Sequence, residues 1–290
     1  MPRVAEPMIP RVTLAAVGDV MLGRGVAAVA RKRGGWRWVF ERARPLVSKA
    51  DIAFCNLECA LTRRKVHVAK KIVLKADPSA VWGLKWCGFN VASLANNHTL
   101  DFGRKGLLDT IRALKRAGIA PCGAGRNLEE ALSPVIVERK GLRVAFLCFC
   151  DFPPPLVFDP EKPCVAPARP DLIRRAVREA KGKADIVVCS FHWGIEYAGW
   201  RSGRQRELAV CAIEAGARLV LGHHPHVLQP LLRYKGVYIA YSLGNFVFDQ
   251  RRQETRRTAV LWCELTKGRV ASARLIPFRI ENFRPVPASG

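Results

Sequence analysis

Short apolar runs of strand length alternate with amphipathic segments of helix length along most of this chain. The runs Arg143–Cys150 and Ile186–Phe191 are almost continuously apolar, and the segment Arg204–Ala215 that follows the second has the length of a helix. Near-continuous apolar strands are typical of a sheet that is covered on both faces. The alternation therefore predicts a layered α/β sandwich.

The expected elements change in character near residue 227. Strands are expected before that point at Val12–Gly18, Asp51–Cys55, Asn90–Leu94, Arg143–Cys150, Ile186–Phe191 and Arg218–Leu221. Helices are expected at Trp36–Lys49, Gly103–Ala117 and Arg204–Ala215. Beyond residue 227, strands follow one another without helices at Leu228–Arg233, Val237–Tyr241, Thr258–Leu265 and Val270–Pro277, which predicts an antiparallel C-terminal tail. We expect one domain over 12–280, with flexible ends at 1–11 and 281–290.

The composition excludes several classes of protein. The 290 residues include 48 Lys+Arg against 24 Asp+Glu, a formal net charge of +24, but 49% are hydrophobic, so the chain is no disordered polycation. No run approaches the roughly 18 apolar residues of a membrane-spanning helix, and the N-terminus lacks the apolar core of a signal peptide. Ten cysteines lie mostly in apolar segments without Cys-x-x-Cys spacing. These features predict a cytoplasmic protein without a transmembrane segment, whose thiols are buried and free.

Polar groups able to bind metals fall where the expected strands end. They are Asp19, Asn56, Glu58, Asn96, Asn97, His98, His192, His223, His224 and His226, and they include five of the six histidines. Ligands of open α/β folds bind beyond the carboxyl ends of the strands, and imidazole with carboxylate suits ions such as Mn, Fe, Co, Ni or Zn. A carboxylate can bridge two ions about 3.5–4 Å apart, a clamp suited to phosphoester hydrolysis. We expect His224 and His226 to alternate along an extended segment and serve one ion each, whereas Asn56 is favoured as a turn residue.

Six motifs in this order carry a resemblance to a known family. They are Gly18-Asp19-Val20-Met21-Leu22-Gly23-Arg24, Asn56-Leu57-Glu58, Leu94-Ala95-Asn96-Asn97-His98 with Asp101-Phe102-Gly103, Phe191-His192-Trp193-Gly194-Ile195-Glu196-Tyr197, Gly222-His223-His224-Pro225-His226 and Tyr241-Ser242-Leu243-Gly244-Asn245-Phe246. Together they resemble the CapA family, which is associated with bacterial poly-γ-glutamate capsule synthesis and looks like part of the calcineurin-like metallophosphoesterase superfamily. The motifs span roughly 12–250. The resemblance implies an α/β/β/α sandwich with mixed sheets and one or two divalent ions, with Mn, Fe or Zn the most plausible.

The resemblance also implies roles for individual residues. Metal ligands would be Asp19 and His226 on the first ion, Asn97, His192 and His224 on the second, and Glu58 as the bridge. His98 would protonate the leaving oxygen, with Asp101 as its orienting partner. Arg24, Glu196 and Asn245 are candidates for contact with substrate, although surface or packing roles explain Arg24 and Glu196 equally well. The superfamily's first motif is Asp-x-His, whereas Met21 replaces that histidine here, and His223 is not implied as a ligand.

Two functions remain open at this level. The first is a metal-dependent phosphoesterase-type hydrolase that serves synthesis or export of poly-γ-glutamate or a similar anionic polymer. The second is a non-catalytic, metal-stabilised component that binds such a polymer for a membrane capsule synthase, an alternative that Met21 keeps open. Basic runs at 63–65, 70–75 and 251–257 flank the expected site and would attract an anionic substrate, although an arginine-rich surface of thermophilic type explains them as well. Nucleic acid is the weaker option because the runs lack interleaved aromatic residues. The family resemblance adds an extracytoplasmic, membrane-associated location as the alternative to a cytoplasmic one.

Overall fold

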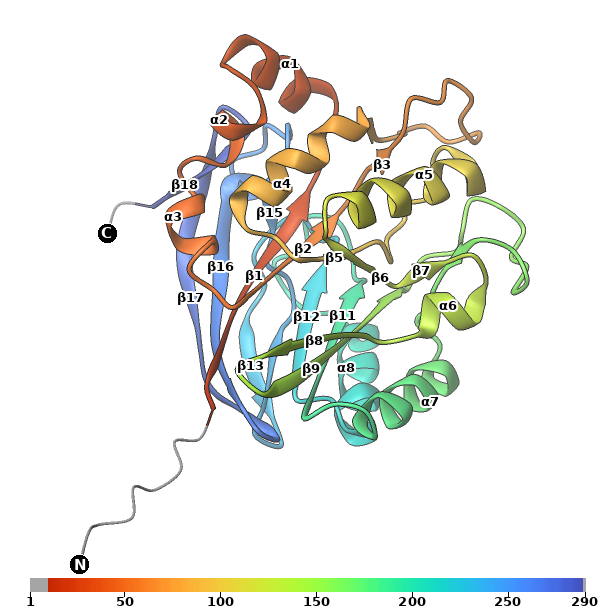
Figure 1. Cartoon of the computed structure of the whole chain (residues 1–290), viewed down its shortest axis with the longest axis vertical. Coiled ribbons are helices and arrows are strands. Elements are labelled where there is room, and N and C mark those ends of the chain that lie inside the picture. Colours follow the sequence, from red (N-terminus) through yellow and green to blue (C-terminus); the bar gives the residue numbers. More distant parts are fainter. Residues whose placement is uncertain (1–9, 289–290) are drawn as a thin grey trace, which may run out of the picture.

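Two mixed β-sheets lie face to face at the centre of the protein (Figure 1). The computed structural model describes residues 10–288. The strands of the first sheet are β1 (Val12–Val20), β2 (Ile52–Leu57), β5 (Val91–Ser93), β6 (Ala120–Cys122), β15 (Asn245–Val247), β16 (Arg257–Thr266), β17 (Arg269–Glu281) and β18 (Arg284–Pro287). Their order is β18-β17-β16-β1-β2-β5-β6, and β15 pairs with β1. β1, β2, β5 and β6 are parallel to one another, so the ends of these four strands meet at one edge.

The second sheet has a parallel centre and antiparallel margins. Its strands are β8 (Val135–Arg139), β9 (Leu142–Cys150), β11 (Ile186–His192), β12 (Leu219–His223), β13 (Leu231–Tyr234) and β14 (Val237–Ala240), in the order β13-β14-β12-β11-β9-β8. β9, β11, β12 and β14 are parallel, whereas β8 and β13 are antiparallel to their neighbours. Short pairs are formed by β3 (Ala60–Leu61) with β4 (Lys75–Ala76) and by β7 (Ala124–Gly125) with β10 (Cys164–Val165).

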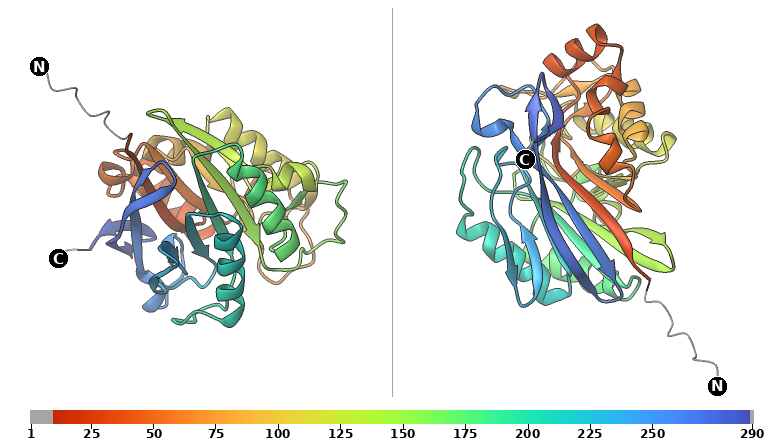
Figure 2. Two further views of the ribbon diagram at one scale, coloured as in Figure 1. Left: turned by 90° about the horizontal axis from the view of Figure 1, so that it is seen from below. Right: turned by 90° about the vertical axis from the view of Figure 1, so that its left-hand side faces the viewer.

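Helices cover the outer faces of the two sheets (Figures 1 and 2). The helices are α1 (Arg24–Lys32), α2 (Trp36–Phe40), α3 (Arg44–Val47), α4 (Val81–Cys87), α5 (Gly103–Arg116), α6 (Leu128–Leu132), α7 (Pro170–Lys181) and α8 (Gly203–Ala215). α5 contacts β6 of the first sheet, and α7 and α8 contact β9, β11 and β12 of the second. The α/β/β/α layering with mixed sheets that the sequence predicts is confirmed.

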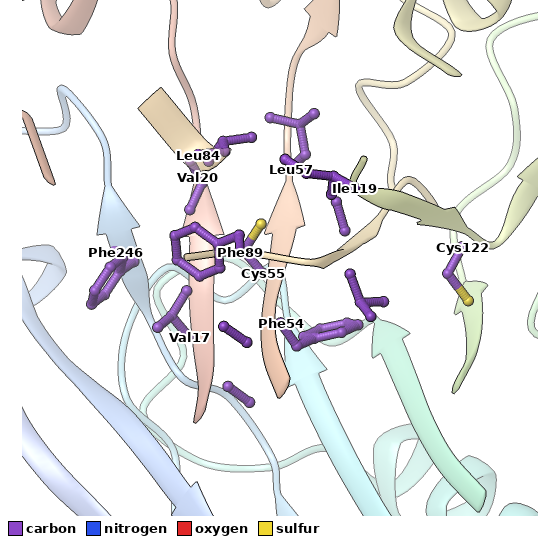
Figure 3. Packing of buried hydrophobic residues seen from close by; sticks show 14 of the residues in the cluster. Val17, Val20, Phe54, Cys55, Leu57, Leu84, Phe89, Ile119, Cys122 and Phe246 are labelled. Carbon is purple, nitrogen blue, oxygen red and sulfur yellow. The ribbon is translucent and has the colours of Figure 1, made fainter. Parts of the chain in front are cut away.

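Side chains alternate between two cores because successive residues of a strand point to opposite faces. On β9, Val144 and Phe146 belong to the core between the two sheets, while Leu147 and Phe149 belong to the core under α7 and α8. Phe146 stacks on Phe54 of β2 with ring centroids 5.6 Å apart, which joins the two sheets directly. Figure 3 shows Phe54 within this packing, together with other apolar side chains of the cluster such as Val17, Leu57 and Phe89.

Three expectations about elements differ from the structure. The helix expected over 36–49 is divided into α2 and α3, because Pro45 has no N–H to donate and is tolerated only in the first turn of a helix. The C-terminal strands are antiparallel from β16 to β18, but the β13–β14 hairpin brings β14 back parallel to β12. The end expected to be flexible from 281 instead forms β18, which pairs with β17. Residues 1–9 and 289–290 lie outside the described part.

Two further expectations concern the cysteines and membrane-spanning helices. All ten cysteines lie within 10–288, none forms a disulfide, and nine are buried, as expected. Burial raises the pKa of the thiols of Cys59, Cys150 and Cys263 to about 12 and that of Cys164 to about 11. Between residues 10 and 288, no helix has both the length and the apolar character needed to cross a membrane.

Candidate metal centre

The polar strand ends of both sheets meet in one buried cluster. Asp19 on β1 stands opposite Asn56 on β2, and His192 on β11 stands opposite His223 on β12. Asp19, Asn56 and Glu58 have no exposed surface, and His192 is 1% exposed. The predicted gathering of these residues at the carboxyl ends of the strands is therefore what the structure shows.

Glycine makes the close approach of the chain segments possible. A Cβ at Gly18 would stand 1.9 Å from the carbonyl oxygen of Gly244, and one at Gly222 would stand 2.0 Å from that of Tyr241. Real Cβ atoms do not approach backbone so closely, so both positions require glycine. The Gly244 carbonyl also accepts a hydrogen bond from the Asp19 N–H at 2.9 Å. Sequence motifs that contain these glycines thus hold the ends of β1 and β12 in place.

Asp19, Glu58 and His226 form one side of the cluster. His226 Nδ1 lies 3.2 Å from Asp19 Oδ2, and its Nε2 lies 3.8 Å from Glu58 Oε1. The Oδ1 of Asn245 accepts the Nδ1 proton of His226 at 2.9 Å, which leaves Nε2 as the free lone pair that faces Glu58. This arrangement positions His226 as a ligand in the manner typical of metal-bound histidines.

Asn97, His192 and His224 form the other side. His192 Nε2 lies 3.1 Å from Asn97 Oδ1 and 3.2 Å from His224 Nδ1. Atoms bound at about 2.1 Å to one tetrahedral ion lie roughly 3.4 Å apart, so these three fit a common ion. Burial, and then the charge of neighbouring His226, lowers the pKa of His224 to about 3, and burial with His224 lowers the pKa of His192 well below its usual value. Both imidazoles are therefore neutral near pH 7, which is the form that binds metals.

The backbone at the two histidines is strained. His224 has φ +97° and His226 has φ +60°, with Pro225 between them. The segment expected to be extended is instead a bend, so the two rings do not reach their positions by strand alternation. Non-glycine residues adopt such angles at a cost of order 1–3 kcal/mol, and such strain clusters at functional sites.

Glu58 provides the test of whether a cation fits here. Both of its carboxylate oxygens are buried without a hydrogen-bond partner in the described structure. One oxygen atom from Asp19, one from Glu58 and one nitrogen of His192 lie within 4.8 Å of one another. Burial raises the pKa of Glu58 well above its usual value, and the charge of Asp19 raises it further. Burial also acts to raise the pKa of Asp19, but the neighbouring imidazoles of His223 and His226 hold it well below its usual value. A buried carboxylate without donors is costly alone and suits a bound cation, so the residues fit a divalent ion.

His98 and Asp101 form a pair beside Glu58. His98 Nδ1 donates to Asp101 Oδ2 at 2.6 Å, and its Nε2 lies 3.8 Å from Glu58 Oε1. Lys70 donates to Asp101 Oδ1 at 3.0 Å and to the Asn97 carbonyl at 2.7 Å, and the Leu74 N–H donates to Asp101 at 2.7 Å. Asp101 thus orients His98 as the resemblance implies. Lys70 was not expected in this role, since the sequence placed it only within a basic run.

Asn56 and His223 support Asp19 rather than occupy turns or solvent. Asn56 lies in β2, and its Nδ2 donates to Asp19 Oδ1 at 2.8 Å, so its interpretation as a turn residue was wrong. Asn96 donates in turn to Asn56 Oδ1 at 3.1 Å and accepts from the His98 N–H at 3.1 Å. His223 Nδ1 lies 3.5 Å from Asp19 Oδ1 in a buried position. The interpretation of His223 as a neighbour of the ligands, without a ligand's place, agrees with this geometry.

Met21, at the position of the superfamily's histidine, takes no part in the cluster. It has no exposed surface, and its Sδ accepts a hydrogen bond from the Gly23 N–H at 3.0 Å. The thioether is therefore engaged by the backbone and belongs to the core. The donor set expected for the first ion is therefore one protein ligand smaller than the superfamily pattern.

The residues expected to contact substrate have different surroundings. Arg24 forms a salt bridge with Asp249. Asn245 is fully buried, and it accepts from His226 while its Nδ2 donates to Gln250 Oε1 at 3.0 Å. These contacts join segments far apart in the sequence, and contact of either residue with substrate stays a prediction. Glu196 is exposed, and its carboxylate lies within 4.8 Å of ligand nitrogens of His224 and His226.

Comparisons with known proteins agree with the motifs. The family described as "Bacterial capsule synthesis protein PGA_cap" matches residues 13–250. The capsule biosynthesis protein CapA of Bacillus anthracis is 38% identical over 288 residues, which cover 96% of this chain and 70% of that protein. The PGA biosynthesis protein CapA of Bacillus subtilis (strain 168) is 36% identical over 275 residues, which cover 93% of this chain and 72% of that protein.

Solved structures share the fold at low sequence identity. A hypothetical protein from Thermus thermophilus gives a TM-score of 0.61 at 16% identity, covering 93% of this chain and 100% of that one. A putative 5'-nucleotidase from Staphylococcus aureus gives 0.60 at 14% identity, covering 97% of this chain and 55% of that one. These likenesses confirm the layered sandwich fold. With the family match over residues 13–250, they show that this chain belongs to the bacterial capsule synthesis protein family PGA_cap, the CapA family.

Proposed function

We propose that this protein is a metal-dependent phosphoester hydrolase that acts in the synthesis or export of an anionic capsule polymer. The observation that carries the proposal is Glu58, a buried carboxylate with no hydrogen-bond donor in the described structure, placed beside His192 and His226 and next to the His98–Asp101 pair. A divalent ion bound there would polarise a phosphoryl oxygen and lower the pKa of a coordinated water. The ions we propose are Mn, Fe or Zn, because the donors mix imidazole, carboxylate and amide oxygen.

Residues of the chain would bind the two ions and orient the group that donates a proton to the substrate. Asp19, Glu58 and His226 are proposed for the first ion and Asn97, His192 and His224 for the second, with Glu58 shared. Asp101, fixed by Lys70 and the Leu74 N–H, keeps the Nδ1 proton of His98 engaged, so that Nε2 faces the cluster. We propose that His98 carries the proton for the leaving oxygen at Nε2.

Positive charge beside the cluster supports an anionic substrate. A cavity of about 500 Å³ includes Phe102 and Gly103, which follow Asp101 in the chain, and is lined by four cations, Arg64, Lys65, Arg104 and Lys105, together with Val66 and Leu156. A second cavity of about 340 Å³ includes Arg251 and Arg256. Such a rim raises the local concentration of anions and speeds their capture at low salt. The relatives from Bacillus are named for capsule and PGA biosynthesis, so we propose a polyglutamate-like polymer and membrane capsule-synthase components as partners.

A second candidate function rests on Met21. Because its Sδ is held by the Gly23 N–H, the first ion lacks a histidine that the superfamily pattern provides. A centre weakened in this way would suit a metal-stabilised component that binds the polymer without cleaving it.

Hydrolysis of bis(p-nitrophenyl) phosphate with Mn²⁺, measured together with bound metal, separates the two functions. For the hydrolase, His98→Ala should lower turnover by roughly 10²–10⁴-fold with metal content unchanged. His192→Ala should lose both metal and turnover. His67→Ala is the matched control, because His67 is exposed and is the one histidine of the six outside the cluster. Metal binding without turnover that depends on His98 would refute the hydrolase and support the binding component.

A further inference from the structure

Glu196 is not among the metal ligands that the motifs imply, yet its carboxylate lies close to two of them. Its carboxylate and one nitrogen each of His224 and His226 lie within 4.8 Å of one another. The structure assigns Glu196 as an additional metal ligand at the mouth of the centre, beside His224 and His226. This inference rests on the proposed metal centre and extends it to a residue outside the superfamily pattern.

The loop that carries Glu196 is fixed to the bend that carries the two histidines. The Trp193 N–H donates to the His223 carbonyl at 3.1 Å, and the Tyr197 N–H donates to the Pro225 carbonyl at 2.8 Å. Gly194 turns the chain between these anchors with φ +87°, where a Cβ would stand 2.9 Å from the Gln205 side chain. Hydrogen bonds on both sides of Glu196 thus hold its position relative to His224 and His226. Ligands are effective when their scaffold positions them in this way.

One nitrogen of His226 is free to bind a cation. Asn245 engages Nδ1 of His226, so Nε2, which lies 3.8 Å from Glu58 Oε1, is the atom left for metal. One carboxylate and two imidazoles form a donor set that Zn²⁺, Mn²⁺ and Co²⁺ accept.

Charge argues against a role for Glu196 in holding substrate. Glu196 is an acid beside a rim that otherwise attracts anions, and an anionic substrate would be repelled by its carboxylate. No lysine or arginine nitrogen of the described residues forms an ion pair with it. Arg252, which lies over the ring of the neighbouring Tyr197, is paired with Glu254 at 3.9 Å. A bound cation removes this repulsion.

Titration of the metal-free full chain with Co²⁺ tests the inference by equilibrium dialysis and by visible absorption, which reports coordination. Glu196→Gln should weaken binding of one equivalent by about tenfold or more and change the d–d spectrum. Glu138→Gln is the matched control, because it removes the same charge from an exposed position on β8 and should bind as the wild type does. Glu196 is exposed, so its replacement is not expected to unfold the chain, and unfolding of the metal-free variants checks this directly.

Glu58→Gln distinguishes failure of the inference from failure of the centre. Loss of Co²⁺ in Glu58→Gln, with Glu196→Gln equal to Glu138→Gln in affinity and spectrum, overturns the role of Glu196 alone. Absence of stoichiometric Co²⁺ from the wild type overturns the proposed centre and the inference together. Weakened binding in Glu196→Gln with an altered spectrum supports both.

Discussion

Replacement of Glu58 by glutamine should stabilise the metal-free protein and at the same time abolish its stabilisation by metal. Glu58 has no exposed surface, and neither carboxylate oxygen has a donor within the described structure. Burial, together with the charge of Asp19, raises its pKa. A raised pKa in the folded state means that this group's contribution to stability is greatest below the unfolded value of 4.5 and is lost as the pH rises toward the folded value.

The magnitude follows from linkage. The ordinary pKa of a glutamate, 4.5, lies about 2.5 units below pH 7. At 1.36 kcal/mol per unit, burial of the Glu58 carboxyl therefore lowers the free energy of unfolding at pH 7 by at most about 3.4 kcal/mol. Glutamine keeps the shape and removes the ionisation, but it still buries a polar group. We therefore expect Glu58→Gln to gain about 1–3 kcal/mol at pH 7 and almost nothing at pH 4.5.

The assay is urea unfolding in EDTA at pH 4.5 and pH 7, repeated at pH 7 with Mn²⁺. The wild type should gain about 2.7 kcal/mol when the ion is present at 100 times its Kd, and the variant should gain almost nothing. Glu138→Gln controls for the loss of one negative charge. The reasoning fails if metal-free Glu58→Gln is destabilised at pH 7, or if the difference from wild type is the same at both pH values.

Three further predictions concern packing, acid sensitivity and thiols. Gly222→Ala should destabilise the protein by about 3 kcal/mol in urea unfolding, because its Cβ would meet the Tyr241 carbonyl oxygen at 2.0 Å. Gly199→Ala is the control, because open space surrounds Gly199 and the added methyl group should cost little. Equal destabilisation by the two variants would contradict the packing argument. The pKa of His224 is lowered to about 3, so as the pH falls the unfolded chain binds the His224 proton before the folded chain does. The free energy of unfolding of the metal-free protein should therefore fall by about 1.4 kcal/mol per pH unit below pH 6, and His224→Asn should reduce this slope. An unchanged slope in the variant would show that His224 is charged in the folded state. Cys211 is the one cysteine with intermediate exposure, so Ellman's reagent should titrate at most one thiol in the native protein and ten in denaturant; rapid reaction of several thiols would contradict the burial.

The strand ends show how far sequence reasoning extends to the site. The sequence predicted correctly that polar groups such as Asp19 and His192 gather at one edge, because parallel strands covered by helices leave that edge as the place for polar groups. Local pattern misjudged Asn56, since an asparagine after a strand is more often in a turn, and only the pairing of β2 with β1 brings its amide to Asp19. In the same way, helical spacing over 36–49 predicted one helix, whereas Pro45 begins a separate one because it is tolerated only in a first helical turn.

Contacts between distant segments decided the rest. The sequence predicted no partner for Arg24, and the structure pairs Arg24 with Asp249, which is 225 residues away. Asn245 holds His226, a contact that the sequence did not predict, because β15 pairs with β1 next to Asp19. Lys70 gave no signal beyond its basic neighbours, and only the fold brings it to Asp101.

Periodicity, strand-end chemistry and six ordered motifs by themselves determined the layered α/β class, the family and the identity of most residues in the cluster. These are properties of neighbouring residues, which the sequence records directly. Tertiary structure alone decided which nitrogen of each histidine faces inward, which carboxylate lacks a donor and which acid approaches the bend at His224 and His226. Those properties depend on distances between segments that burial of the two cores fixes, and a sequence does not record such distances.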